Sequence, residues 1–382
     1  MIAKNCNCLN ILSSHYNMEN KTVLVLTNSI GGLHSFRKEV MKALIDEGYN
    51  VVILHPDRDE RGAYFESIGC GDELTEFNRR GMNPMKDLML MSKYFRLIRK
   101  YRPVAVLTYT IKPNVYGGIA CRLLGTPQLA NVTGLGDAVE NGGLLQKLTI
   151  FLYKLGIESA KRVFFQNKYN RKFCIEKHIA DESSILLPGS GVNLLHHQYQ
   201  KYPADGITKF LFIARLLKDK GTEEFFEAAL RIKSKYSNTE FQILGTCEGD
   251  YKERLDALVA DGVINFLGCT SDVRPYLKEV HCTILPSYHE GMSNVNLESA
   301  ANGRPVITTT VPGCQETVDD GITGILCDAK SADSLVSAIE KFLELPYKEK
   351  IDMGLEARKK VEREFDRQII VSAYLEAVES VF

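Results

Sequence analysis

Residues 289–307 read HEGMSNVNLESAANGRPVI and follow an apolar strand pattern at Cys282–Leu285. Two acids, Glu290 and Glu298, stand in a stretch where the strand pattern gives way to a helix pattern. A strand-to-helix turn leaves unpaired backbone N–H groups at the helix start, where an anion is favoured. Carboxylates beside a phosphate-binding helix start can accept hydrogen bonds from hydroxyl groups. The segment therefore points to a nucleotide sugar as its ligand.

Short apolar runs alternate with helical patterns on both sides of this segment, which predicts parallel sheets covered by helices. Further strands are predicted at 21–27, 50–55, 104–108, 161–166, 184–188, 208–214, 239–244, 262–267 and 326–328. Helices are predicted at 35–47, after a Gly31-Gly32 turn, and at 223–236. The alternation of strand and helix patterns stops at a linker, Tyr202–Gly206, and then starts again. We therefore expect two facing α/β domains, with ligands at the carboxyl ends of the strands.

The domain boundaries follow from this alternation. We expect a polar extension at 1–19, an N-terminal Rossmann-like domain at 20–200 and a C-terminal Rossmann-like domain at 201–363. Apolar residues at helical spacing predict a last helix at 364–382.

Composition is that of a soluble globular protein, with 382 residues, 45% hydrophobic and 25% charged. No apolar run is long enough to span a bilayer and no signal-peptide pattern opens the chain. The ten cysteines are scattered without a C-x-x-C pair, which indicates reduced thiols and no metal centre. We therefore expect a cytoplasmic protein.

Charge is divided unevenly along the chain. Residues 1–200 hold 25 Lys and Arg against 18 Asp and Glu, whereas the remainder holds 22 against 30. A basic half suits an anionic membrane surface or a diphosphate-bearing acceptor. Random drift in surface charge explains the same numbers equally well.

The 289–307 segment resembles the signature of retaining glycosyltransferases of family 4, which have the GT-B fold. The segment Phe212–Gly221 resembles the family's donor-diphosphate segment, in which Arg215 and Lys220 match the two cations. Breaking the sugar–phosphate bond leaves a nucleoside diphosphate with an extra negative charge. Fixed cations and helix N–H groups can stabilise that charge without a metal, so no cofactor is expected. In such enzymes the last helix crosses back onto the first domain.

The resemblance also assigns roles within the signature. Glu298 is expected to accept hydrogen bonds from the ribose hydroxyls, and Glu290 to lie near the donor sugar and the reacting centre. Gly291, Met292 and Ser293 are expected to offer N–H groups to the phosphates, with Ser293 or Asn294 capping the helix. Met292 and Asn296 differ from commoner family residues, which suggests that they tune the choice of sugar.

Two glycine turns complete the expected donor side. Ser29–Leu33 follows the first strand, where the family places a glycine turn (Gly31, Gly32) against donor and acceptor. It is not G-x-G-x-x-G and no acid closes the second strand, which argues against a nicotinamide enzyme. Pro188–Asn193, with Gly189, either lines the cleft or is a plain turn.

The segments 109–118 and 130–136 resemble bacterial enzymes that extend lipid-diphosphate-linked sugars. Many relatives carry a histidine within 109–112, where this chain has Thr110, Ile111 and Lys112. Thr110 or Lys112 is expected to contact sugar hydroxyls or an acceptor phosphate. The alternative is that Lys112 is an ordinary loop lysine. His289 is a weaker candidate for the sugar side, because its only distinction is its neighbour Glu290.

Two further features allow a plainer explanation. Residues 81–102 mix methionines, aromatic residues and cations. They are either the core face of a helix or a basic amphipathic helix on an anionic membrane. His196-His197 has no metal-ligand spacing and is interpreted as a solvated loop pair.

Together these patterns predict a retaining, metal-independent GT-B glycosyltransferase. Its expected donor is a nucleotide diphosphate sugar, UDP-linked, carrying a hexose or N-acetylhexosamine. Its expected acceptor is a polyprenyl-diphosphate-linked saccharide in polysaccharide assembly, reached by peripheral contact with the inner membrane face. No nucleic-acid partner is expected. The alternatives are a GT-B sugar-nucleotide epimerase and a non-catalytic GT-B partner in a glycan-assembly complex.

Overall fold

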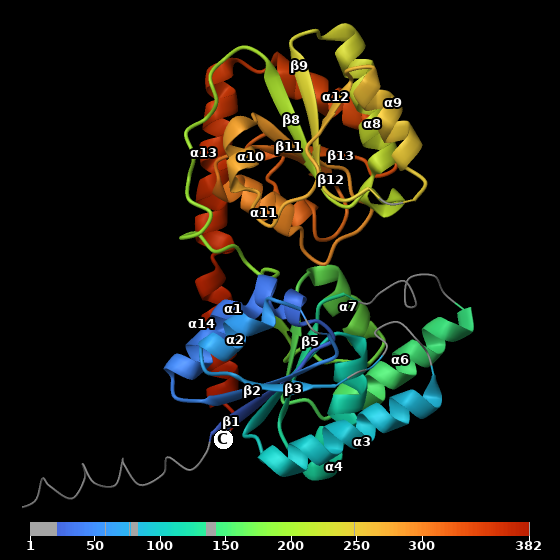
Figure 1. Cartoon of the computed structure of the whole chain (residues 1–382), viewed down its shortest axis with the longest axis vertical. Coiled ribbons are helices and arrows are strands. Elements are labelled where there is room, and N and C mark those ends of the chain that lie inside the picture. The colour runs from blue at the N-terminus through green and yellow to red at the C-terminus, as the bar shows by residue number, and fades with distance from the viewer. Residues whose placement is uncertain are drawn as a thin grey trace, which may run out of the picture. The chain divides into compact units, whose positions relative to one another are not determined.

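The computed structural model describes residues 21–57, 59–75, 77, 83–134, 143–247 and 249–381 (Figure 1). The expected extension at 1–19 lies outside these residues, as do Gly81, Leu135 and Gly136. No helix of the described part is long and apolar enough to cross a membrane.

Contacts divide the chain into two compact units. The N-terminal unit comprises Met1–Phe164, Lys177–Ser184 and Ala373–Phe382, and the C-terminal unit comprises Phe165–Glu176 and Ile185–Ser372. This division assigns residues 165–176 and 185–200, which the sequence boundary at 200 places in the first domain, to the C-terminal unit. The last helix, α14 (Arg367–Glu379), contributes to both units.

The first sheet has seven strands in the order β3-β2-β1-β4-β5-β6-β7, and the pairs from β3 to β5 are parallel. Its strands are β1 (Thr22–Leu26), β2 (Asn50–His55), β3 (Gly71–Leu74), β4 (Ala105–Tyr109), β5 (Gln128–Val132), β6 (Arg162–Phe165) and β7 (Ile185–Leu186). The helices between them are α1 (Ile30–Asp46), α2 (Gly62–Ser67), α3 (Pro84–Tyr101), α4 (Gly118–Leu124), α6 (Gly143–Ile157) and α7 (Lys168–Glu176). A π-helical turn, Pro113–Gly117, precedes α4.

One face of this sheet is covered by α3 and α4, whose buried side chains pack on β1, β2 and β4. On α14, Tyr374 is fully buried and stacks on Phe164. Its hydroxyl donates to the Asn131 side chain and accepts from the buried Arg37 guanidinium of α1 (3.1 Å). A strand carrying Asn131 and a helix carrying Arg37 are thus joined to the chain's last helix inside the N-terminal unit.

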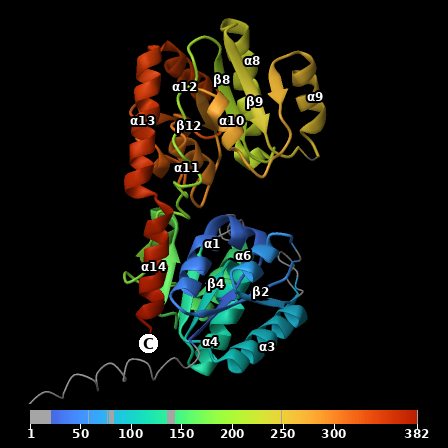
Figure 2. The same cartoon turned by 60° about the vertical axis from the view of Figure 1, so that its left-hand side comes forward.

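The second sheet has six parallel strands in the order β10-β9-β8-β11-β12-β13. They are β8 (Thr208–Ile213), β9 (Thr239–Leu244), β10 (Ile264–Phe266), β11 (Cys282–Leu285), β12 (Val306–Thr309) and β13 (Gly324–Cys327). The helices are α8 (Thr222–Lys235), α9 (Lys252–Ala260), α10 (Arg274–Glu279), α11 (Asn294–Ala301), α12 (Ala332–Glu344) and α13 (Tyr347–Glu364). One core joins α8, α9 and α12 with Met353 of α13, while α10 and α11 contribute to other clusters (Figure 2).

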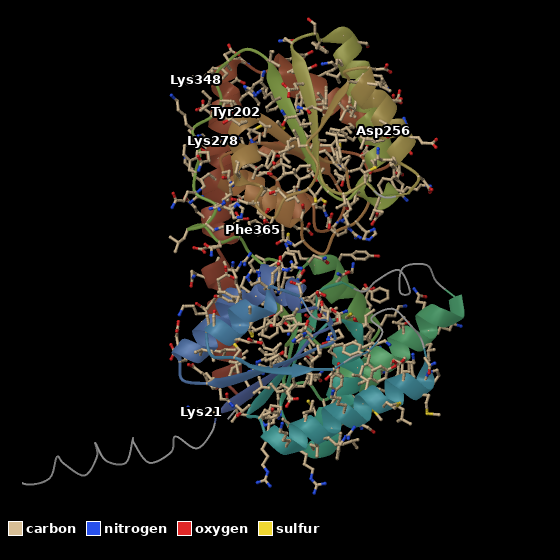
Figure 3. All side chains as sticks on the ribbon, viewed as in Figure 1. Lys21, Tyr202, Asp256, Lys278, Lys348 and Phe365 are labelled. Carbon is tan, nitrogen blue, oxygen red and sulfur yellow. The ribbon has the colours of Figure 1, made fainter. Side chains whose placement is uncertain are left out.

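Arg304 connects the elements of the C-terminal unit from within. Its guanidinium is fully buried and donates to main-chain carbonyls only, among them Leu277 (2.7 Å), Gln200 (3.0 Å) and Lys278 (3.0 Å). It also lies over the ring of Tyr202, which Figure 3 labels beside Lys278. Burial lowers the pKa of Arg304 to about 10. The closing Gly303–Ile307 of the signature is thus a packing element.

The fold predicted from sequence is confirmed, with shifted boundaries. Both sheets carry the doubly wound order in which the first and fourth strands are neighbours. The helix predicted at 35–47 begins at Ile30, so Gly31 and Gly32 lie in its first turn and not in a separate turn. The helix predicted at 364–382 is α14, which follows a separate α13. The strand β3 has no apolar run and was not predicted.

Candidate active site

The candidate residues of the C-terminal unit lie in loops that leave β8 and β11. These strands are neighbours, with Cys282 paired to Phe210, and being parallel they end at the same edge of the sheet. From β8 the chain turns toward β9, and from β11 toward β12, so connections diverge here. Crevices at such switch points are where doubly wound sheets bind ligands.

Lys220 and Glu290 form an ion pair across these two loops. The Lys220 Nζ lies 2.7 Å from the Glu290 Oε1, and the side chains are 20% and 18% exposed. Lys220 ends a 3₁₀ turn and is followed by Gly221 at φ 72°. A Cβ on Gly221 would lie 2.1 Å from the Pro286 carbonyl oxygen, so only glycine permits the two loops to approach this closely.

Main-chain bonds fix the same two loops. The N–H of Tyr288 and the hydroxyl of Ser287 both donate to the Asp219 carbonyl, at 2.8 and 3.1 Å. The Glu290 N–H donates to the Pro312 carbonyl at 3.3 Å. The cation and the carboxylate are therefore held by rigid backbone.

Arg215 lies in the same loop as Lys220 but is exposed. Its neighbours are anchored, since the Leu216 N–H donates to the Thr246 carbonyl at 2.9 Å. Within the described chain the Arg215 side chain makes no ion pair. It is a cation available to an anionic ligand.

The start of α11 provides backbone donors at this edge. Ser293 is its N-cap and accepts from the Asn296 N–H, while its own N–H donates to Gly313 (2.7 Å). Among the residues that the structure describes, no acceptor is recorded for the N–H groups of Gly291 and Met292. Asn294 is the first helical residue. These features suit an anion at the helix start.

Side chains near the helix start differ in accessibility. His289 is exposed, whereas Met292 is buried in a cluster with Val192 and Leu297. Gly189 has φ 65°, and a Cβ there would lie 2.3 Å from the Met292 Cγ. Gly189 is thus required for packing on Met292. Met292 could reach a ligand mainly through its backbone.

Asn296 was expected to tune the choice of sugar, but its side chain has no exposed surface for direct contact with a sugar. Its side chain is fully buried and donates to the hydroxyls of Thr308 (3.2 Å) and Thr317 (3.0 Å). Asn296 joins α11 to the strand beside it.

Glu298 lies on α11 with its side chain 27% exposed. Burial raises the pKa of Glu298 to about 7, against an opposing effect of Arg367 and a reinforcing one of Asp272. The His197 Nε2 lies 4.0 Å from the Glu298 Oε1. Burial thus keeps this carboxyl group protonated up to a higher pH than an ordinary glutamate.

His197 was interpreted from sequence as a solvated loop residue, and this is wrong. It is buried, and burial lowers the pKa of its imidazole to about 4. The Asn302 Nδ2 donates both to the Glu298 carbonyl (2.7 Å) and to the His197 Nδ1 (3.2 Å). The Nδ1 therefore accepts, and in the neutral ring the Nε2 carries the hydrogen on the side of the Glu298 carboxyl.

No local signal marks His197 in the sequence, because its partners Glu298 and Asn302 belong to a helix far along the chain. Arg367 is similar. It donates to the Gly191 carbonyl (2.9 Å), in the Pro188–Asn193 loop, and its charge acts on Glu298.

The remaining candidates belong to the N-terminal unit. Ser29 caps α1 by accepting from the Gly32 N–H (3.1 Å), and the Asp57 carboxylate accepts from the Ile30 N–H (3.1 Å). The Arg61 guanidinium lies so close to Gly31 that a Cβ there would be 2.1 Å from its Nη2. The Ile30 and Gly32 amides of this helix start are thus already bonded to groups of the chain itself.

Thr110 and Lys112 follow β4, beside β1 in the sheet. Thr110 has φ 72°, a region that non-glycine residues rarely adopt, and its hydroxyl is buried with no partner among the residues that the structure describes. The Lys112 Nζ lies 2.7 Å from the Asp87 Oδ1, with side chains 14% and 12% exposed. Asp87 also accepts from the Tyr116 hydroxyl (3.0 Å). Lys112 is therefore not an ordinary exposed loop lysine.

Known protein families match both halves of this chain. A family described as glycosyl transferase 4-like matches residues 23–167, and one described as glycosyl transferases group 1 matches residues 207–345. The chain belongs to these glycosyltransferases. Its fold is GT-B, and it is an enzyme that transfers sugars.

Two bacterial relatives are informative. One from Campylobacter jejuni is the N,N'-diacetylbacillosaminyl-diphospho-undecaprenol alpha-1,3-N-acetylgalactosaminyltransferase, 25% identical over 93% of this chain and 98% of that protein. One from Escherichia coli is the UDP-Gal:alpha-D-GlcNAc-diphosphoundecaprenol alpha-1,3-galactosyltransferase, 27% identical over 68% of this chain and 71% of that protein.

Among solved structures, HepE from Anabaena in complex with UDP and glucose is similar. It has a TM-score of 0.77 and 17% identity, and the match covers 94% of this glycosyltransferase and all of that chain. At this identity the likeness shows the fold.

Proposed function

We propose that this glycosyltransferase moves a hexose or N-acetylhexosamine from a UDP-sugar to a polyprenyl-diphosphate-linked saccharide, with retention of the anomeric configuration. The reaction serves bacterial polysaccharide assembly at the inner face of the cytoplasmic membrane. Support comes from the two bacterial relatives, whose names specify diphospho-undecaprenol acceptors, and of which one specifies UDP-galactose.

The observation that carries the proposal is the Lys220–Glu290 pair beside the exposed Arg215 at the switch point of the C-terminal sheet. In the free protein, Glu290 neutralises Lys220. A diphosphate between Arg215 and Lys220 competes for the same ammonium group. Lys220 then turns to the phosphate, which releases the Glu290 carboxylate to accept a hydroxyl of the donor sugar.

The chemical step needs no protein nucleophile. The bond from the sugar's anomeric carbon to the phosphate oxygen breaks, and a bond to the acceptor oxygen forms on the same face. The acceptor's proton passes to the departing phosphate oxygen. Arg215, Lys220 and the N–H groups of Gly291 and Met292 stabilise the charge that builds up on the diphosphate, in place of a metal.

Glu298 binds the other end of the donor in this proposal. Its carboxylate accepts hydrogen bonds from the ribose hydroxyls, while the charge of Arg367 favours the ionised form. On the acceptor side, the buried hydroxyl of Thr110 and the Lys112 ammonium are the groups that meet a sugar hydroxyl or the acceptor diphosphate.

The test combines binding and transfer. The purified protein is screened by thermal shift against UDP, GDP and their sugars, and then assayed with each stabilising donor and a polyprenyl-diphosphate-linked saccharide. We expect UDP to stabilise, one UDP-sugar to be consumed, an α-linked product from an α-linked donor by NMR, and an unchanged rate in EDTA. An inverted product, or no transfer from any donor, overturns the proposal.

A further inference from the structure

Three neighbouring helices of the N-terminal unit expose apolar side chains that the proposed chemistry does not use. Helix α4 packs against both α3 and α6 (Figure 1). We call their outward face the α3–α4–α6 surface. Its exposed large apolar residues are Met85, Leu88, Met89, Leu123, Leu148 and Phe151, of which Met85, Met89 and Leu123 are about two-thirds exposed (69%, 66% and 67%). A cluster of this kind marks an interaction site more often than single exposed residues do.

Helix α3 has the core face that one interpretation of residues 81–102 predicts, and it also exposes apolar side chains. Its inner face, with Leu90, Tyr94 and Ile98, is buried in the core under the sheet. Its first turns carry Met85, Leu88 and Met89 outward. Burial of the inner face anchors the helix and so presents the outer residues at fixed positions.

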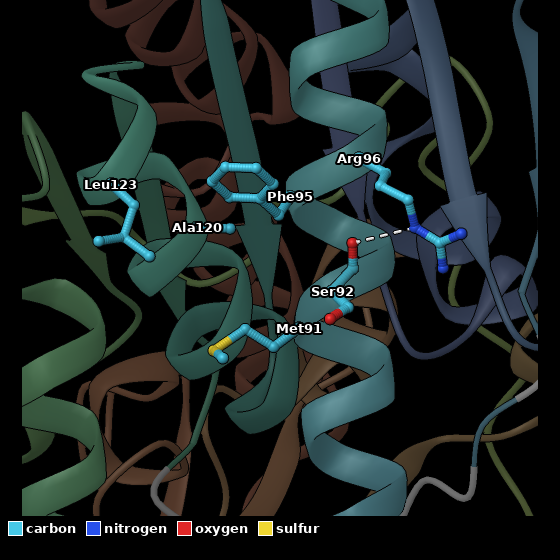
Figure 4. Close-up of a pocket in the computed structure, with 6 residues that line it drawn as sticks. All are labelled: Met91, Ser92, Phe95, Arg96, Ala120 and Leu123. Carbon is cyan, nitrogen blue, oxygen red and sulfur yellow. Dashed lines mark hydrogen bonds between the residues drawn. The ribbon is translucent and has the colours of Figure 1, made fainter.

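A pocket of about 410 Å³ opens on this surface between α3 and α4. Its lining residues are Met91, Ser92, Phe95, Arg96, Ala120 and Leu123. Figure 4 shows the Phe95 ring and the Met91 thioether reaching toward Ala120 and Leu123, while the Arg96 guanidinium points away from them. The pocket is thus mostly apolar, with a cation on its rim.

Charge on the three helices is almost entirely positive. Within Pro84–Tyr101, Gly118–Leu124 and Gly143–Ile157 there are eight Lys and Arg residues and one acid, Asp87. That acid is buried and bonded to Lys112 and Tyr116. Lys100 and Arg122 pair with Glu73 and Glu158 at the margins. These helices therefore hold much of the basic excess of the chain's first half.

The remaining cations stand next to the apolar residues. On α6, Lys147 and Lys154 lie one turn on either side of Phe151, and on α3 Lys86 follows Met85. In the described part of the chain, Lys86, Lys147 and Lys154 have no carboxylate partner. Long lysine side chains can place their stems along apolar surface while the ammonium groups reach phosphate.

We propose that the α3–α4–α6 surface binds an anionic lipid bilayer. The exposed methionine, leucine and phenylalanine side chains enter the interface between headgroups and acyl chains, and the cations contact lipid phosphates. The inference rests on the proposed function, because a polyprenyl-linked acceptor confines the reaction to a bilayer. The choice of a bilayer over an acidic protein rests on the flexible apolar side chains spread over three helices and ringed by cations.

The test is sedimentation with vesicles of phosphatidylcholine alone or mixed with phosphatidylglycerol. We expect the protein to bind the mixed vesicles, and salt to weaken that binding. The variant Met89→Ser/Leu123→Ser/Phe151→Ser is expected to bind roughly tenfold less to both kinds of vesicle. The variant Lys86→Glu/Lys147→Glu/Lys154→Glu is expected to lose the preference for phosphatidylglycerol.

Matched controls change the same residue types on the C-terminal unit. They are Leu230→Ser/Val259→Ser/Ile322→Ser and Lys278→Glu/Lys341→Glu/Lys348→Glu, all at exposed positions. Both controls should bind vesicles as the wild type does, and unfolding temperatures identify any variant that fails to fold. Equal binding by all variants, or binding to an acidic protein but to neither vesicle, overturns the proposal.

Transfer assays separate this inference from the proposed function. The surface variants should keep their rate with a short-chain, water-soluble acceptor and lose rate with the acceptor embedded in vesicles. If the protein transfers sugar to the embedded acceptor but does not bind vesicles, the proposed lipid-binding surface is wrong and the proposed function stands. If the protein binds vesicles through this surface but transfers sugar to no polyprenyl acceptor, the proposed function is wrong and the lipid-binding surface stands.

Discussion

The two sheets have the same strand order, yet the loops at their carboxyl edges differ in which cations and backbone amides they leave available to a ligand. At the edge of the C-terminal sheet, Arg215 is exposed, Lys220 is held by a single carboxylate, and the N–H groups of Gly291 and Met292 have no recorded acceptor within the described chain. At the corresponding edge of the N-terminal sheet, Asp57 occupies an amide of α1 and Asp87 holds Lys112. Both edges hold a lysine paired with one carboxylate, and they differ in that only the C-terminal edge adds the exposed Arg215 and, within the described chain, two amides without a recorded acceptor.

This difference suits two kinds of ligand. A nucleotide diphosphate brings two phosphates, so open cations and amides gain charge-assisted hydrogen bonds when it binds. An acceptor presents a neutral hydroxyl to the reacting centre, and an open cation there would compete for the donor's phosphates. We infer that engaged charges in the N-terminal unit help to direct the diphosphate to the C-terminal unit.

The largest expected effect comes from removing the cation of the C-terminal edge. Lys220→Ala should lower kcat by roughly 10²–10³, because the charge that develops on the departing diphosphate loses a fixed partner. Steady-state transfer rates measure it, with Lys218→Ala, an exposed lysine in the same turn, as the control. If Lys220 served only to balance Glu290, the double variant Lys220→Ala/Glu290→Ala would regain the wild-type rate, which would contradict the assignment.

Breaking the ion pair of the N-terminal edge should lower the stability of the protein and raise the KM for the acceptor. Lys112→Met leaves the mostly buried Asp87 without its cation and should cost about 2 kcal/mol of unfolding free energy. The KM for the acceptor should rise while the Kd for UDP stays unchanged. Urea unfolding, acceptor kinetics and calorimetry measure the three quantities, with Lys93→Met on the neighbouring α3 as the control. Weaker UDP binding by Lys112→Met would remove the distinction between the two edges.

Local patterns in the sequence predicted the fold and the charged half of the site. The strands β2, β9 and β11 lie at the predicted residues, because β2 and β11 are short, mainly apolar runs and β9 alternates polar and apolar side chains. The Lys220 and Glu290 segments were found because each follows such a strand. These roles in catalysis stay predictions until the variants are measured.

What the sequence could not predict depends on contacts between distant segments. The burial of His197 follows from Asn302 and from Arg358, which donates to its carbonyl (2.7 Å). The Asp87 partner of Lys112 lies on another helix, and no spacing rule relates the two. The early start of α1 was missed because two glycines suggest a turn, whereas the Ser29 cap and the Asp57 contact stabilise a helix there.

A pH effect of intermediate size is expected at Glu298. Its pKa of about 7 in the free protein lies above the ordinary value, so its ionisation is unfavourable in the fold. Hydroxyl groups of a ribose bind better to the carboxylate, so affinity for UDP should rise as pH rises through about 7 and level off above it. Calorimetry should show a gain of roughly tenfold between about pH 6 and about pH 8, and Glu298→Gln should abolish it.

The same group has the opposite effect on stability. Because the folded-state pKa is raised, the stabilising contribution is present below the unfolded pKa and is lost as pH rises toward about 7. Glu298→Gln should therefore gain unfolding temperature relative to wild type at neutral pH and not at acidic pH. A UDP affinity independent of pH in the wild type would contradict the assignment of Glu298 to the ribose.

The smallest expected effect tests the claim that α1 is already capped by its own chain. Asp57→Asn removes a negative charge from the start of that helix and should cost about 0.5–1 kcal/mol of unfolding free energy, measured in urea. Asp46→Asn is the matched control, because Asp46 ends the same helix, where a negative charge is unfavourable. That variant should be neutral or slightly more stable, although it also loses the exposed pair with Lys42. UDP affinity should not change in either variant. If Asp57→Asn instead created tighter phosphate binding, the N-terminal edge would be a latent anion site closed by one carboxylate, and the difference between the two edges would reduce to that residue.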